Sequence, residues 1–319
     1  MNALSGAAIW SAHPAARVLR SFQLVPCDVY DAQVFPDGRR IVILAATRLA
    51  TIWDVDSGEL LLGLHNTADA PHHVARVFPD SGRLVTGVSF HQRSASIIWN
   101  ALDGTVIHTM RQVDPTAFLA LSGSGDSLAT AGHMSLALWD TETGQLRRTV
   151  ERAHWWSWGI DITWDGETVV KSEGGDMVVW DGASDEPPVT FKVGGDSIAA
   201  FALLPDSSRA VVLTTSEAAV WDVGRGERLR VLDDDIGFVA QSLAVSPSGD
   251  VVAACGGEPM EDPEEDSNTI TTKAWEVATG RRVLHVVEED AQDIDNLMPI
   301  FHCSVAVGPN RDAFELLRW

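Results

Sequence analysis

The chain has 319 residues, 45% hydrophobic and 21% charged, and this balance is typical of a folded globular protein rather than a disordered one. Its formal net charge of −22 disfavours direct binding to nucleic acid or to anionic membranes, because phosphate groups would be repelled. No apolar run approaches the roughly 18 residues that span a bilayer, and the first ten residues do not resemble a signal peptide, so we expect a cytoplasmic protein.

Tryptophans recur along the chain at intervals of 40 to 54 residues, and each closes a short apolar or β-branched run. A period of this length indicates a solenoid, a propeller or another array of repeats. The repeated residues are Trp10, Trp53, Trp99, Trp139, Trp180, Trp221 and Trp275.

The segment 34–64 shows what one repeat contains. It begins with Val-Phe-Pro-Asp-Gly, which predicts a strand that runs into a turn. Three further strands are predicted at 40–45, 49–53 and 59–64. A small sheet of four antiparallel strands cannot bury both faces alone, so neighbouring repeats must stack on one another.

These residues resemble a known family, the WD-repeat β-propellers, in a divergent, bacterial-type form. The resemblance covers nearly the whole chain and rests on turns such as Phe-Pro-Asp-Gly at 35–38, Trp-Asp endings and the Thr-Gly or Ser-Gly turns that follow them. It implies blades supported by a hydrogen-bond network of His, Ser or Thr, Asp and Trp. Only the fourth repeat offers these residue types, as His154, Ser172, Asp176 and Trp180.

The two ends of the chain are expected to complete the last blade together. The distance from Asn310 to Trp319 leaves room for one strand only, at 313–318, after a strand at 302–307. Predicted strands at 6–10 and 17–22 supply the missing pair. We therefore predict an all-β, seven-bladed WD-repeat β-propeller that forms a single domain over 1–319, with its last blade built from 1–22 and 302–319.

Cysteine and histidine spacing gives no indication of a metal site. Cys27, Cys255 and Cys303 form no spaced pair, so we expect buried, reduced thiols rather than a disulfide framework or a zinc site. His72 and His73 are expected to belong to a polar rim and not to hold a metal. We predict no cofactor.

The longest interval between tryptophans results from an acidic insertion at 256–268, between the second and third strands of the sixth repeat. Acidic connections around 233–235 and 288–295 should lie on the same face of the propeller. Three interpretations remain: a solvating loop, a docking patch for a basic protein segment, or a calcium site, which lacks EF-hand-like spacing. The candidate partner-binding carboxylates are Asp234, Glu258, Glu261, Asp262, Glu264, Glu265, Asp266, Glu288 and Glu289.

Two further connections carry candidate partner-binding residues. His154, Trp155 and Trp156 precede the first strand of the fourth repeat, where the tryptophans would either anchor a partner or cover the core of the blade. Phe90 and Arg93 belong to an exposed loop between the second and third strands of the second repeat.

Catalytic motifs are scarce. The chain has no Gly-x-Ser-x-Gly elbow, no phosphate-binding glycine loop and no His-Glu-x-x-His. Trp158, Ile160, Ile162 and Trp164 alternate on one side of a predicted strand, which favours Trp158 as a core residue. Asp161 points the other way, and as a lone carboxylate it is better interpreted as a solvated channel residue than as an acid–base catalyst.

We therefore expect a monomeric, non-enzymatic interaction scaffold or a regulatory, inhibitory subunit that binds a protein partner through its top face. The top face is the one that carries the connections from second to third strands and those from each fourth strand to the next blade. In its specific form the partner is a basic regulatory or nucleic-acid-binding protein, which the acidic propeller would mask. The alternative is a propeller enzyme or small-molecule-binding protein with a site at the channel mouth, lined by Asp161 and His154.

Overall fold

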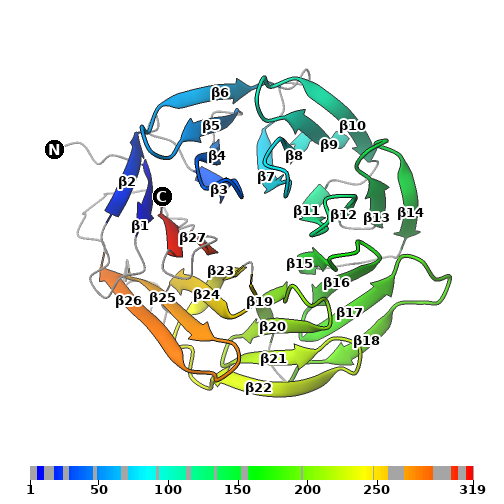
Figure 1. Cartoon of the computed structure of the whole chain (residues 1–319). Coiled ribbons are helices and arrows are strands. Elements are labelled where there is room, and N and C mark those ends of the chain that lie inside the picture. The colour runs from blue at the N-terminus through cyan, green and yellow to red at the C-terminus, as the bar shows by residue number, and fades with distance from the viewer. Residues whose placement is uncertain are drawn as a thin grey trace. The chain divides into compact units, whose positions relative to one another are not determined.

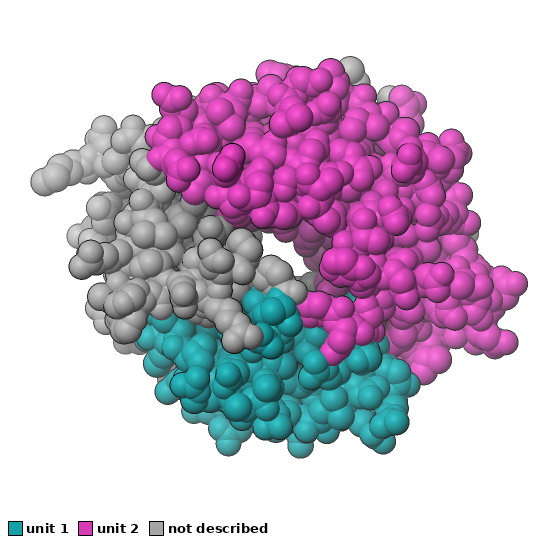
Figure 2. Space-filling model, in the orientation of Figure 1, with its two compact units in different colours: residues 1–28, 196–204, 208–319 teal, residues 29–195, 205–207 magenta. Residues whose placement is uncertain are grey.

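A computed structural model describes most of the chain, and its residues group into two compact units (Figure 2). Unit 1 comprises residues 1–28, 196–204 and 208–319, and unit 2 comprises residues 29–195 and 205–207. The described residues are 6–10, 18–23, 29–45, 49–65, 71–90, 93–112, 116–132, 135–151, 157–194, 197–246, 248–257, 269–289, 303–307 and 314–318. All regular elements in these ranges are β-strands.

Unit 2 contains four antiparallel sheets of four strands, and each sheet follows the chain from one edge to the other (Figure 1). The first two sheets are β3 (Val29–Val34), β4 (Arg40–Ala45), β5 (Ala50–Asp54) and β6 (Leu60–Leu64), then β7 (His72–Val77), β8 (Arg83–Phe90), β9 (Arg93–Asn100) and β10 (Val106–Gln112). The next two are β11 (Thr116–Leu121), β12 (Ser127–Gly132), β13 (Ser135–Asp140) and β14 (Leu146–Glu151), then β15 (Ser157–Ile162), β16 (Thr168–Glu173), β17 (Asp176–Asp181) and β18 (Val189–Lys192).

Unit 1 contains two more four-stranded sheets and two hairpins. The sheets are β19 (Ile198–Leu203), β20 (Arg209–Thr214), β21 (Ala218–Asp222) and β22 (Glu227–Asp233), then β23 (Val239–Val245), β24 (Val251–Gly257), β25 (Thr269–Glu276) and β26 (Arg282–Glu289). The hairpins are β1 (Gly6–Trp10) with β2 (Val18–Gln23), and β27 (Cys303–Val307) with β28 (Phe314–Arg318). β27 lies against β23 and β24, and β28 lies beside β1.

The chain thus has the all-β fold of a β-propeller, as predicted, but the number of complete blades differs from the prediction. The described strands make six four-stranded sheets, not seven. The strands expected to form the seventh blade are present at the predicted places, and they are divided between two two-stranded sheets. Of these strands, only those within each hairpin are shown to pair. They pair antiparallel, with Gly6 opposite Gln23 in the first hairpin and Cys303 opposite Arg318 in the second.

Four of the repeat tryptophans pack where neighbouring blades meet, in the structural role expected from their period. Trp99 lies in one buried cluster with Phe35, Val42 and Ile52 of the preceding blade. Trp275 occupies the same place in unit 1, and Trp139 and Trp180 do so elsewhere in unit 2. Because a sheet of this size cannot bury its faces alone, each indole stabilises two blades at once.

Hydroxyl groups join successive first turns within unit 2. Ser81 and Ser207 have positive φ angles of 55° and 61° and stand where other blades have a glycine such as Gly38. The hydroxyl of Ser81 accepts a hydrogen bond from the backbone N–H of Asp37 at 3.0 Å, and that of Ser207 accepts one from Trp164 at 2.8 Å. These inter-blade bonds compensate for the backbone strain that a non-glycine residue incurs at positive φ.

Cys255 departs from what its spacing suggested. It lies on β24 and is buried, as expected, but it is disulfide-bonded. The prediction of reduced thiols is therefore wrong for this residue.

Candidate functional site

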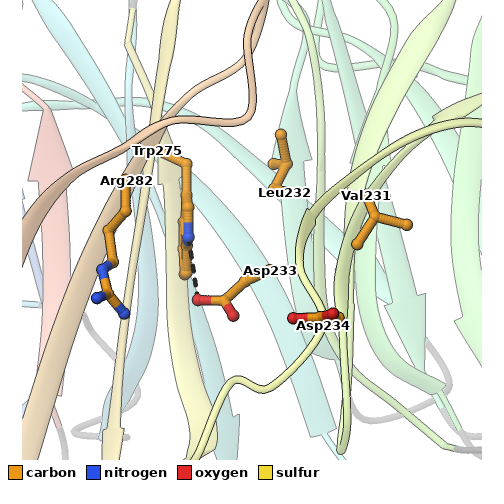
Figure 3. A pocket seen from close by; sticks show the side chains of 6 residues that line it. All are labelled: Val231, Leu232, Asp233, Asp234, Trp275 and Arg282. Carbon is orange, nitrogen blue, oxygen red and sulfur yellow. Dashed lines mark hydrogen bonds between the residues drawn. The ribbon is translucent and has the colours of Figure 1, made fainter.

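Asp234, one of the carboxylates predicted to bind a partner, lines an open pocket in unit 1 that has a volume of about 390 Å³ (Figure 3). The end of β22 and the connection to β23 form one side of the pocket, and β25 and β26 form the other. Its lining comprises Val231, Leu232, Asp233, Asp234, Trp275 and Arg282.

Asp233 is the central group of this pocket, and it interacts inside the protein. Its Oδ2 atom accepts a hydrogen bond from the indole N–H of Trp275 at 3.2 Å, drawn in Figure 3, and one from Lys273 Nζ at 3.3 Å. Lys273 Nζ also donates to the backbone oxygen of Asp235 at 3.0 Å and lies 6.0 Å from the centre of the Phe238 ring. The side chains of Asp233 and Lys273 are 13% and 7% exposed, so this ion pair is largely desolvated.

The network follows from the pleat of β25. Lys273 and Trp275 are two residues apart on that strand, so both side chains lie on the face that packs against the preceding blade. A buried ammonium group needs an anionic or carbonyl partner, and β22 provides Asp233 at its last position. Asp233 therefore fastens two blades together, while Asp234 and Asp235 remain exposed to solvent.

Positive groups limit how far the acidic surface extends on this side. Burial and the charges of Arg282 and Lys273 lower the pKa of His285 on β26, and Asp233 opposes that shift. Arg282 also lines the pocket, so the wall formed by β26 carries a cation. Asp234 and Asp235, which follow β22 on the other side of the pocket, are exposed.

Most of the other predicted partner-binding residues cannot be placed in this site. His154, Trp155, Trp156 and the acidic residues between 258 and 266 lie outside the described residues. Glu288 and Glu289 are the last residues of β26, opposite Ile270 and Thr269. Phe90 ends β8 and Arg93 begins β9, so the two are paired strand residues on either side of the connection rather than members of the predicted loop.

A second polar network lies in the second blade, although the network was expected only in the fourth. Thr86 Oγ1 lies 2.9 Å from the indole nitrogen of Trp99 and 2.9 Å from His72 Nδ1, and all three side chains are buried. The indole N–H is only a donor, so Thr86 Oγ1 accepts the hydrogen bond from Trp99. These residues are the His, Thr and Trp members of the network that the family resemblance implies.

His72 therefore differs from the prediction that it belongs to an exposed rim. Burial, and to a lesser degree the nearby His73 and His65, lower the pKa of His72 to about 4. The ring is therefore neutral at pH 7, and its Nδ1 shares a hydrogen bond with the Thr86 hydroxyl. Thr86 and Trp99 lie on neighbouring strands, at positions whose side chains point to the same face, and this pattern could have revealed the network.

Trp164 is exposed, unlike Ile162, with which it was expected to share one side of a strand. Ile162 is 4% exposed, whereas Trp164 is 57% exposed, because β15 ends at Ile162 and Trp164 belongs to the turn. The ring of Trp164 lies over Gly123 so closely that a Cβ at that glycine would approach one of its carbons to 2.0 Å. Asp161, on β15 itself, is half-buried and accepts a hydrogen bond from the N–H of Ile162 at 2.8 Å.

The described ranges contain no cluster of three or more His, Cys, Asp or Glu residues placed to hold a metal ion. The same ranges contain no helix long and apolar enough to cross a membrane. Compared with models of known protein families and with curated proteins, the chain matches none.

Proposed function

We propose that this protein is a non-enzymatic interaction scaffold that binds a basic segment of a partner protein. The exposed pair Asp234 and Asp235 supports the proposal most directly. Asp234 lines a pocket whose wall includes Val231, 39% exposed, and Asp235 follows it in the chain, so a segment that combines Lys or Arg with an apolar residue fits the site. The net charge of −22 would accelerate the association with such a partner.

Charge reversal at the pocket tests this function. We expect Asp234→Lys to weaken the binding of a fluorescent Lys/Arg-rich peptide roughly fivefold, because an attractive contact becomes a repulsive one. Anisotropy titrations at about 50 and 300 mM NaCl would also show weaker binding at high salt, since exposed charges are screened.

Glu227→Lys provides the matched control, because it changes the net charge equally and lies at the opposite end of the same strand, β22. The peptide should bind to this variant almost as tightly as to the unmodified protein. Equal weakening by both substitutions would show that the peptide responds only to overall charge, and the proposed site would be wrong.

We further infer that the protein is a divergent WD-repeat β-propeller, possessing a seventh blade formed from both ends of the chain. The His72–Thr86–Trp99 network supports the family, since it joins the residue types that the resemblance implies. The position of β28 beside β1 supports the blade, since pairing of these strands would unite the two hairpins in one four-stranded sheet.

Amide hydrogen exchange on the full chain tests the seventh blade. We expect the amides of β1 and β28 to be protected from exchange to a degree similar to those of β25, because strand pairing engages their N–H groups. The peptides 6–10 and 314–318 would be followed by mass spectrometry. Exchange at the rate of free edge strands at both positions would contradict the closure.

The predicted cytoplasmic location stays a prediction. The disulfide of Cys255 argues for an oxidising compartment, because stable disulfides are rare in the reducing cytosol.

A further inference from the structure

The disulfide of Cys255 is the basis of a further inference, which does not depend on the proposed scaffold function. Cys255 is fully buried on β24, in a cluster with Ala253, Ile270 and Ala274 of the same sheet. Its bond must reach another cysteine, and the chain has only Cys27 and Cys303 besides it. The neighbours of β24 therefore decide which cysteine is the partner.

We propose that Cys255 pairs with Cys303 and that this bond fastens the C-terminal hairpin to the sixth blade. β27 begins at Cys303, and this strand lies against both β23 and β24 within unit 1. A disulfide needs Cα atoms within roughly 7 Å, a condition that favours cysteines on adjacent strands. Cys27 lies outside the described residues.

The bond forms by exchange with a small-molecule disulfide such as oxidised glutathione. One cysteine thiolate attacks a sulfur of the oxidant and releases one glutathione thiolate, which leaves a mixed disulfide. The second cysteine, as its thiolate, attacks the protein sulfur of that mixed disulfide and releases the second glutathione. The two protein thiols together lose two protons and two electrons, and the oxidant is reduced to two thiols.

Such a bond closes the segment 256–302 into a covalent loop. The acidic insertion predicted at 256–268 lies within it, although its first two residues belong to β24, and so does the end of β26. Cross-linking a long segment restricts the unfolded chain and so stabilises the folded state. Reduction would therefore loosen the attachment of the C-terminal hairpin to the sheet β23–β26.

Peptide mapping identifies the partner directly. Cleavage after Lys and Arg places the cysteines in three separate peptides, 21–39, 231–273 and 283–311. The full chain, purified without reductant and alkylated when denatured, should yield 231–273 joined to 283–311, with 21–39 alkylated. A link between 231–273 and 21–39, or alkylation of all three peptides, would overturn the proposal.

Melting temperatures give a second, independent test. Without reductant, Cys303→Ser should melt about 5–10 °C below the unmodified protein and close to the protein treated with dithiothreitol. Cys27→Ser is the matched control and should melt like the unmodified protein. If Cys303→Ser melts unchanged while Cys27→Ser melts lower, the assignment is wrong. Peptide mapping of the unmodified protein remains decisive should the serine variant not fold.

Discussion

Replacement of Gly256 by alanine is expected to lower the free energy of unfolding by at least about 4 kcal/mol, or to prevent folding altogether. A Cβ at this position would lie 1.9 Å from the backbone oxygen of Val239 and 2.7 Å from Cδ2 of Phe238. Neither atom can move aside cheaply, because Val239 belongs to the paired strand β23 and Phe238 is buried in the core between two blades. Urea denaturation followed by circular dichroism would measure the effect.

Gly63→Ala is the control for this substitution. Gly63 also lies within a strand, β6, but the nearest atom to its added Cβ would be Nε2 of His65 at 3.8 Å. We expect its stability to change by no more than about 1 kcal/mol, since a compatible alanine mainly restricts the unfolded chain. A similar loss at both glycines would show that close approach of the backbone is not the cause.

The second large effect is expected for Thr86→Val, which should reduce stability by about 2–5 kcal/mol. Valine has the shape of threonine but no oxygen, so the buried Trp99 N–H and His72 Nδ1 would both lose the partner at 2.9 Å. Each unsatisfied polar atom in a buried site incurs a desolvation penalty. The urea midpoint would decrease, with little change in the dependence of the unfolding free energy on urea concentration.

Thr51→Val is the control that tests whether the loss of stability depends on burial. Thr51 likewise accepts a hydrogen bond from an indole, that of Trp53 at 2.9 Å, but both residues are only half-buried. Water can replace the lost hydroxyl there, so we expect a loss of about 1 kcal/mol or less. Comparable losses in Thr51→Val and Thr86→Val would contradict the importance of the buried network.

Local patterns were sufficient to predict the strands of this protein. The predicted strands 6–10 and 40–45 coincide with β1 and β4, because alternation and turn residues are properties of neighbouring positions. Alternation fails beyond a strand end, which is why Trp164 was placed with Ile160 and Ile162. The turn that contains Trp164 directs its side chain independently of β15.

The polar networks and the disulfide could not be predicted because they depend on which strands become neighbours. His72 contacts Thr86 on the neighbouring strand, and Lys273 contacts Asp233 of the preceding blade. Cys255 forms a disulfide, although no other cysteine lies near it in the sequence. Asp234, one of the predicted binding residues, is exposed, but the sequence did not distinguish it from the adjacent Asp233, whose carboxylate forms an ion pair inside the protein.

The serines of the first turns have a consequence for how the repeats arose and how they could be rearranged. Ser81 and Ser207 each bond the blade before their own, through Asp37 and Trp164. A duplicated or transplanted blade would keep its own turn but would meet a different predecessor. Both donors are backbone N–H groups, so a new predecessor could supply one only if its first turn placed an N–H at the same point. With a turn of different length the hydroxyl would lack its donor while the strain at positive φ remained. A serine in this turn therefore restricts which turn the preceding blade can have.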